Sequence, residues 1–141
     1  MKSREDGITI LVSEITAWAA LCDFTGRSKW VALNYKQQLI SEEPMQHGTH
    51  IRCDVGYGEC LLSVQEFDPP HRLVIAGTIG TARLRVSYKV MDILDGAYVG
   101  VCLELDNDLE EEGSQLTVFR EWAIDQLNSI KRQAELGPRM R

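Results

Sequence analysis

The sequence predicts an α+β fold in which one antiparallel sheet is packed around a long C-terminal helix. Residues 114–135 form a continuous segment without Gly or Pro, and Gly137-Pro138 follows it, a pair at which helices commonly end. Most of residues 49–105 instead alternates apolar and polar residues, as half-buried strands do. Because every strong strand pattern precedes the long helix, one sheet covering that helix is the simplest arrangement.

The composition is that of a single globular domain spanning residues 1–141. Hydrophobic residues make up 44% of the chain, and charged residues make up 26%. The net charge is −6 and basic residues do not cluster, which argues against a nucleic-acid partner. No apolar run approaches the roughly 20 residues that span a bilayer, and the charged N-terminus is no signal peptide. We therefore expect a cytoplasmic protein with reduced cysteines, namely Cys22, Cys53, Cys60 and Cys102.

The N-terminal part of the chain predicts one strand and two short helices. Residues 7–12 alternate as a strand, and Ser13 then suits the N-cap of a helix that runs through Cys22. Residues 27–33 form a second short helical segment, which carries Trp30. Both helices are too short for crossovers in a parallel sheet, so we expect them to plug one end of the sheet.

Residues 35–43 begin a series of strands, and a hairpin follows them. A strand over residues 49–56 turns at Tyr57-Gly58, and its return strand ends at Asp68-Pro69-Pro70, which cannot continue a sheet. A two-residue turn at Tyr57-Gly58 predicts three pairs with all side chains on one face: Val55–Cys60, Cys53–Leu62 and Ile51–Val64.

A second pair of hairpins starts at Arg72 and has the clearest alternation in the chain. Four residues are apolar or aromatic and predicted to be buried (Leu84, Val86, Tyr88 and Val90), whereas Arg83, Arg85, Ser87 and Lys89 between them are polar. Asp95-Gly96 is typical of a type I′ turn. That turn predicts the pairs Val90–Val101, Tyr88–Leu103 and Val86–Leu105.

The C-terminal helix carries one apolar stripe. Ser114 is its predicted N-cap, and a helical period predicts a buried stripe about 80° wide. Trp122 lies at the edge of that stripe, beside Gln126, Ser129 and Gln133. The residues of the stripe are Leu116, Phe119, Ala123, Leu127, Ile130 and Ala134.

Two segments carry a family pattern. Residues 12–30 pass from a strand into a helix with the aromatic Trp18, and then reach Asp23 and Trp30. Residues 64–73 form a hairpin arm that ends in a proline-rich turn. Together with the element order β-α-α-β-β-β-β-β-β-α, these segments resemble the START, birch-pollen-allergen and polyketide cyclase/dehydratase (SRPBCC) superfamily. The resemblance implies a helix-grip fold, in which a curved antiparallel sheet wraps around the long C-terminal helix.

The resemblance also implies an apolar pocket between sheet and helix that binds a small hydrophobic molecule, lipid-like or polyketide-like. The inward faces derived above supply the lining, with Phe119 and Trp122 contributed by the helix. A filled core without a pocket would bury the same residues, so both hypotheses remain open. The candidate ligand-binding residues are Trp30, Tyr35, Ile51, Cys53, Val55, Leu62, Val64, Val86, Tyr88, Val101, Phe119 and Trp122.

The sequence carries little catalytic signal. It contains neither a GxSxG nucleophile motif nor a phosphate-binding glycine loop, and we expect neither a cofactor nor a metal ion. Glu66 shares the parity of Leu62 and Val64, which predicts an inward carboxylate that could act as a general base. Binding of a small hydrophobic ligand is therefore the leading hypothesis. A cyclase- or dehydratase-type enzyme and a protein-interaction module of the same fold are the alternatives.

Overall fold

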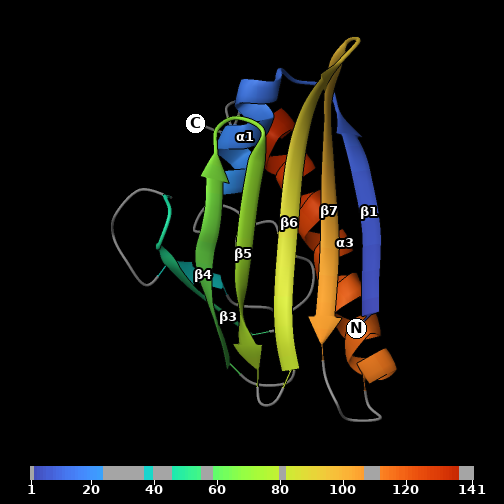
Figure 1. The fold of residues 1–141 in the computed structure, drawn as a ribbon. Coiled ribbons are helices and arrows are strands. Elements are labelled where there is room, and N and C mark those ends of the chain that lie inside the picture. The colour runs from blue at the N-terminus through green and yellow to red at the C-terminus, as the bar shows by residue number, and fades with distance from the viewer. Residues whose placement is uncertain are drawn as a thin grey trace.

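The computed structural model describes residues 2–23, 37–39, 46–54, 59–79, 82–106 and 112–136. These residues form an antiparallel sheet of seven strands in the order β1-β7-β6-β5-β4-β3-β2, together with two helices (Figure 1). The predicted second short helix and most of the predicted strand at residues 35–43 lie outside them. The elements are β1 (Lys2–Ile10), α1 (Glu14–Cys22), β2 (Gln37–Leu39), β3 (His50–Asp54), β4 (Glu59–Asp68), β5 (Arg72–Ile79), β6 (Ala82–Ile93), β7 (Gly96–Asp106) and α3 (Glu112–Leu136).

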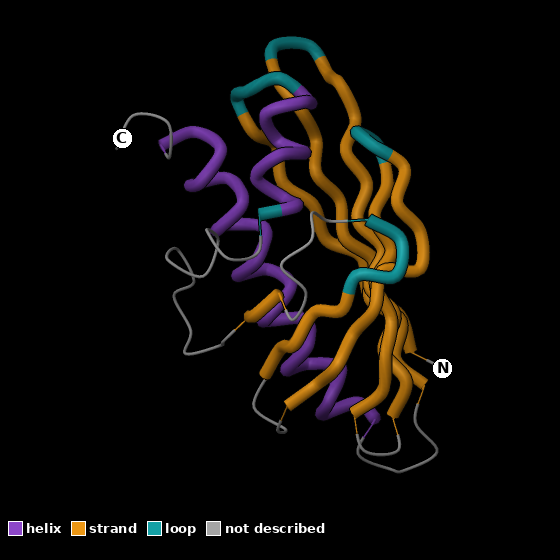
Figure 2. Tube along the Cα trace, turned by 90° about the vertical axis from the view of Figure 1, so that its left-hand side faces the viewer, coloured by secondary structure: helices purple, strands orange, loops and turns teal. Residues whose placement is uncertain are grey.

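The sheet curves over α3, as the side view shows (Figure 2). The helix packs against β1, β7 and α1, and its buried residues include Ala123, Leu127, Ile130 and Ala134 from the predicted stripe. Leu116 and Phe119 belong to the helix, but their side chains are outside the described part. The predicted α+β helix-grip architecture is therefore confirmed. No helix in the described ranges is long and apolar enough to cross a membrane.

The sequence predicts the first residue of α1 correctly but not that of α3. Ser13 is the N-cap of α1, and its Oγ accepts a hydrogen bond from the Thr16 amide at 3.3 Å. The predicted N-cap at Ser114 is wrong, because α3 already begins at Glu112. Gly113 has a low helix propensity, which is why the sequence predicts a later start. The residue before it is Glu112, and the helix dipole favours an acidic residue in the first turn.

The first strand is longer than predicted. It begins at Lys2 and ends at Ile10, and it pairs with β7 along its whole length. The polar run Arg4-Glu5-Asp6 hides its alternation. Pairing with β7 imposes strand geometry on these residues regardless of their low strand propensity, so the edge of the sheet is continuous here.

The predicted faces of β6 are confirmed, although its predicted partners in β7 are wrong. Leu84, Val86, Tyr88 and Val90 are buried, whereas Arg83, Arg85 and Lys89 are exposed. The observed pairs are Val90–Val99, Tyr88–Val101 and Val86–Leu103, two residues from the predicted register.

The shift arises because the turn is Leu94-Asp95 and not Asp95-Gly96. Asp95 has the positive φ, 65°, and Gly96 already pairs with Ile93 in the strands. A Cβ atom on Gly96 would collide with the carbonyl oxygen of Ile10, so close packing of the β1 end requires glycine there. A two-residue shift keeps each side chain on its predicted face.

The hairpin of β3 and β4 shows the same kind of error. Ile51 pairs with Leu62 and Cys53 with Cys60, again two residues from the prediction. Asp54–Glu59 is the last described pair, and the predicted turn at Tyr57-Gly58 lies outside the described residues.

A β-bulge in β4 overturns the prediction for Glu66. The register shifts between Val64 and Glu66, so that Glu66 pairs with Val74 on the outer face. Its carboxylate forms an ion pair with Arg72 at 3.2 Å and is about half exposed. The extra residue, Gln65, instead turns Phe67 towards the core, where it packs against the buried cluster. Glu66 is therefore no inward general base.

Candidate functional site

The inward face of the sheet contains the predicted binding residues whose side chains the structure describes. They are at most 3% exposed and belong to one apolar cluster between sheet and helices: Ile51, Leu62, Val64, Val86, Tyr88 and Val101. The structure thus brings together residues from β3, β4, β6 and β7. Cys53 lies in β3, and Phe119 and Trp122 lie in α3, but their side chains are outside the description. Trp30, Tyr35 and Val55 fall outside the described residues.

Polar groups interrupt this apolar interior at two places. Tyr88 of β6 is 0% exposed, so its hydroxyl is enclosed in the domain. Gln126 of α3 is also 0% exposed and belongs to the buried face of the helix. A phenol hydroxyl and a side-chain amide can both donate and accept hydrogen bonds, so these two groups have the chemistry to orient a bound molecule.

Gln126 is not among the predicted binding residues, because the sequence places it at the edge of the helix stripe. Gln126 follows Ala123 by three positions and precedes Ile130 by four, the spacing of residues on one helix face. This spacing indicates that Gln126 shares the buried face of the helix. Ser129, at 1% exposure, is buried beside it but donates its hydroxyl to the Asp125 carbonyl oxygen at 2.7 Å within the helix.

Helix α1 covers one end of the inward face, as predicted for the first short helix. It contacts β6, β7 and α3. Trp18 of α1 packs on Phe67 of β4, with ring centroids 5.7 Å apart and an interplanar angle of 47°. This contact depends on the β4 bulge, because the bulge turns Phe67 inward. An aromatic contact therefore joins α1 to β4 at this end of the sheet.

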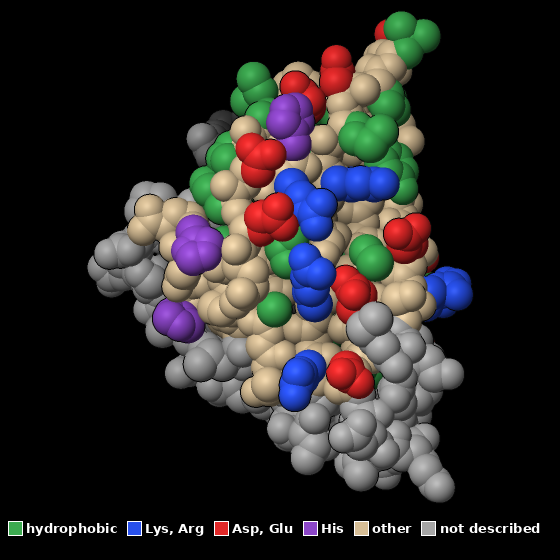
Figure 3. Space-filling model, viewed as in Figure 1, with side chains coloured by type: hydrophobic (Ala, Val, Ile, Leu, Met, Phe, Trp, Pro, Cys, Tyr) green, Lys and Arg blue, Asp and Glu red, His purple; other side chains and the backbone are tan. Residues whose placement is uncertain are grey.

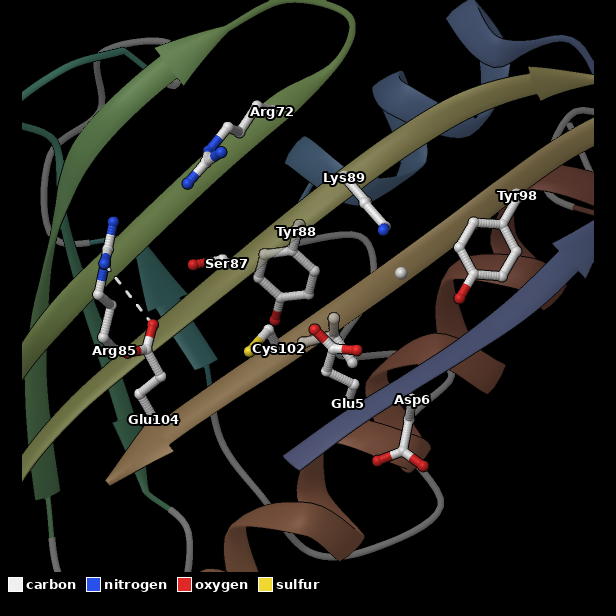
Figure 4. Close-up of a pocket in the computed structure, with 12 residues that line it drawn as sticks. Glu5, Asp6, Arg72, Arg85, Ser87, Tyr88, Lys89, Tyr98, Cys102 and Glu104 are labelled. Atoms are coloured by element: carbon white, nitrogen blue, oxygen red, sulfur yellow. Dashed lines mark ion pairs between the residues drawn. The ribbon is translucent and has the colours of Figure 1, made fainter. Parts of the chain in front are cut away.

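The outer face of the sheet differs completely from the inner one. Lys and Arg side chains gather along its centre, with Asp and Glu on both sides (Figure 3). Here β1, β5, β6 and β7 border a hollow of about 260 Å³ (Figure 4). Arg72, Lys89 and Tyr98 line it together with Glu5 and other residues. Of these side chains, only Lys89 carries a sequence prediction, which places it on the exposed polar face of its strand.

Two glycines make room for the side chains of Lys89 and Tyr98 at the edge of this hollow. Gly7 and Gly100 are opposite one another in β1 and β7, and Lys89 is opposite Gly100 in β6. A Cβ atom on Gly7 would collide with the phenol of Tyr98, and one on Gly100 would lie 3.0 Å from Lys89 Cε and 3.0 Å from Tyr98 Cε1. The missing side chains therefore leave the space into which Lys89 and Tyr98 lean.

Cys102 lies at the base of the hollow but is unsuited to nucleophilic chemistry. Burial raises the pKa of its thiol, and the carboxylates of Glu104 and Glu5 raise this pKa further; Arg85 and Lys89 oppose them in part. The thiol therefore stays protonated at neutral pH. Neither Cys22 nor Cys102 forms a disulfide bond within the described residues. Within the described ranges, no group of three or more His, Cys, Asp or Glu residues is placed to hold a metal ion.

Comparison with known proteins identifies the fold but no close relative. The sequence matches no protein-family model, and no curated protein is significantly similar to it. A START superfamily protein from Mycobacterium smegmatis has a TM-score of 0.75 at 13% identity, over 94% of this chain and 97% of that one. KanY has a TM-score of 0.75 at 16% identity, over 95% and 97%.

DynU16, from the dynemicin biosynthetic locus, has a TM-score of 0.72 at 18% identity. The match covers 97% of this chain but only 48% of DynU16, so the chain spans about half the length of that protein. At these identities the similarity concerns the fold alone. The chain has the START-like helix-grip fold that its element order suggested.

Proposed function

We propose that this protein binds a small, predominantly apolar molecule, lipid-like or polyketide-like, between the curved sheet and α3. The observation that carries the proposal is the burial of Tyr88 on the sheet and Gln126 on the helix beside a large apolar cluster. Ligand pockets typically combine an apolar lining with a few polar groups that fix the orientation of the ligand.

The comparisons support a small-molecule role in a general way. One structural neighbour is a START superfamily protein, and another comes from the dynemicin biosynthetic locus. A ligand with an apolar body and one or two hydrogen-bonding atoms would match the two inward polar groups. Tyr88 would offer a hydroxyl from the sheet, and Gln126 would offer an amide from the helix.

The test is a titration with Nile red, an apolar fluorescent probe that carries one ring carbonyl. We expect saturable binding to the folded wild type, and Tyr88→Phe and Gln126→Leu should each weaken it. Tyr98→Phe is the matched control, because it removes the same hydroxyl from the outer face. If the folded wild type binds no probe, or if Tyr88→Phe and Tyr98→Phe behave alike, the proposal is wrong.

The interaction-module alternative has one observation in its favour. Leu94 is 92% exposed at the turn between β6 and β7, and Leu11 is 71% exposed after β1. The two turns are adjacent, because the Cα atom of Leu11 lies 3.5 Å from the Cβ position of Gly96. Exposed apolar groups that cluster in this way are typical of contact surfaces. For the enzyme alternative, the predicted general base Glu66 faces outward and pairs with Arg72.

A further inference from the structure

The outer hollow holds one cation and one carboxylate that no neighbouring side chain neutralises. Arg72 pairs with Glu66 at 3.2 Å, and Arg85 pairs with Glu104 at 3.6 Å. In contrast, Lys89 and Glu5 line the same hollow but form no ion pair within the part of the chain that the structure describes.

The sheet register explains why Lys89 and Glu5 stay apart. The row that contains Lys89 continues through Gly100 of β7 and Gly7 of β1, so no side chain beside the lysine carries an opposite charge. Glu5 lies in the next row, opposite Cys102. Figure 4 shows Lys89 and Glu5 extending from β6 and β1 towards the intervening strand β7.

The aromatic ring of Tyr98 borders the space near these two charges. Lys89 Nζ lies 6.0 Å from the ring centroid, at the outer limit for a cation–π contact. The ring is held in place because it packs over the Gly7 backbone. A second cation between Glu5 and the ring would meet both a carboxylate and an aromatic face.

We propose that this hollow binds a small zwitterion with one carboxylate and one ammonium group, the chemistry of a free amino acid. Lys89 holds the ligand carboxylate. Glu5 holds the ligand ammonium, and Tyr98 supplies a ring face beside it. A ligand with a single charge would satisfy only one of these two groups, whereas a zwitterion satisfies both. About 260 Å³ is sufficient space for a small amino acid.

This site is independent of the proposed apolar site. Lys89 and Glu5 lie on the outer face, whereas the side chains of Tyr88 and Gln126 are buried, although Tyr88 also borders the hollow. If one binding activity is lost, the other can therefore still be measured in the same protein.

The experiment is an NMR titration of the ¹⁵N-labelled protein at low salt, observed at the Gly7 and Gly100 amides. Glycine and 4-aminobutyrate are the zwitterions, and acetate and methylammonium are the single-charge halves. We expect one zwitterion to give saturable shifts and to bind about tenfold more tightly than either half, as one added charged contact would produce. Equal binding of acetate and the zwitterions would overturn the proposal, as would the absence of saturable shifts.

Three variants complete the test. Lys89→Gln and Glu5→Gln should each abolish the preference for the zwitterion while the rest of the spectrum is unchanged. Arg83→Gln is the control, since it removes a cation from the same strand outside the hollow. If Glu5→Gln binds the zwitterion as tightly as the wild type, the site recognises anions only and the zwitterion proposal fails.

Discussion

The carboxylate of Glu135, near the end of α3, accepts a hydrogen bond from the backbone amide of Leu11 at 3.0 Å, although the two residues are 124 positions apart. Lys131, one turn earlier, lies 3.6 Å from the same carboxylate and donates a hydrogen bond to the Thr9 carbonyl oxygen at 3.1 Å. The last turns of the helix are thus attached to the backbone that leaves β1.

Replacement of Glu135 should detach this end of the helix from β1. We expect Glu135→Ala to lower the free energy of unfolding by about 1 kcal/mol, the typical net value of one hydrogen bond, because the surface ion pair adds little. Glu135→Gln retains an acceptor oxygen and should recover most of the loss. Urea denaturation is the measurement, with the exposed Arg132→Ala as control; equal effects of Glu135→Ala and Arg132→Ala would contradict the prediction.

The β4 bulge predicts an asymmetry between two single-residue deletions. Deletion of Gln65 removes the extra residue and leaves the pairs Val64–Ile75 and Phe67–Leu73 available. Deletion of Ser63, which pairs with Ala76, instead shifts one arm by one residue and reverses its faces.

We therefore expect the Gln65 deletion to fold with a loss of about 1–2 kcal/mol, within the range of ordinary mutations. The Ser63 deletion should be far less stable, since apolar side chains would be turned into water. Circular dichroism during thermal unfolding compares them. A Gln65 deletion as damaging as the Ser63 deletion would show that the bulge itself is needed.

The turn between β6 and β7 places different demands on Asp95 and on Gly96, the glycine that follows it. Asp95 has φ 65°, so Asp95→Val should cost about 1–2 kcal/mol through left-handed strain, whereas Asp95→Gly should be tolerated. Gly96→Ala should be more damaging than Asp95→Gly, because its Cβ meets the Ile10 carbonyl oxygen. Thermal melts of the three variants test this order; a tolerated Gly96→Ala would favour the turn that the sequence predicted.

Cys102 offers a test of the electrostatics of the outer face. Its folded-state pKa is raised above the ordinary value of 9.0, by burial first and then by Glu104 and Glu5. Its contribution to stability is therefore fully present below pH 9 and is lost as pH rises through the folded pKa. Glu5→Gln removes one cause, so alkylation of Cys102 by iodoacetamide should become faster at a fixed pH. Mass spectrometry resolves Cys102 from Cys22, the internal control; an unchanged rate would contradict the prediction.

Side-chain alternation made the buried faces predictable before the strand partners were known. The faces of β6 are correct despite the wrong pairs, since a two-residue shift preserves parity. The bulge at Gln65 has no comparable sequence signature, and Glu66 was assigned to the wrong face for that reason. Strand β1 escaped detection in part because pairing with β7, and not its own composition, determines its extent.

The inward binding residues could be predicted by the same alternation, but the outer hollow could not. Its edge has room for Lys89 and Tyr98 because Gly7 and Gly100 lie opposite one another, and this is known only once β1 is paired with β7. The burial of Gln126 could have been predicted from helical spacing, because Gln126 lies on the same helix face as Ala123 and Ile130.

The pairing of β1 with β7 also has a consequence for how the chain folds. Ile10 finds its partner at Ala97, so the first strand remains unpaired during synthesis until the last strand has left the ribosome. Contacts between such distant segments make closure slow. Until then both edges of β1 are unpaired, and a second nascent chain could add a strand at the edge that β7 later covers. The polar run Arg4-Glu5-Asp6, which obscured the strand in the sequence, protects that edge while it waits for β7.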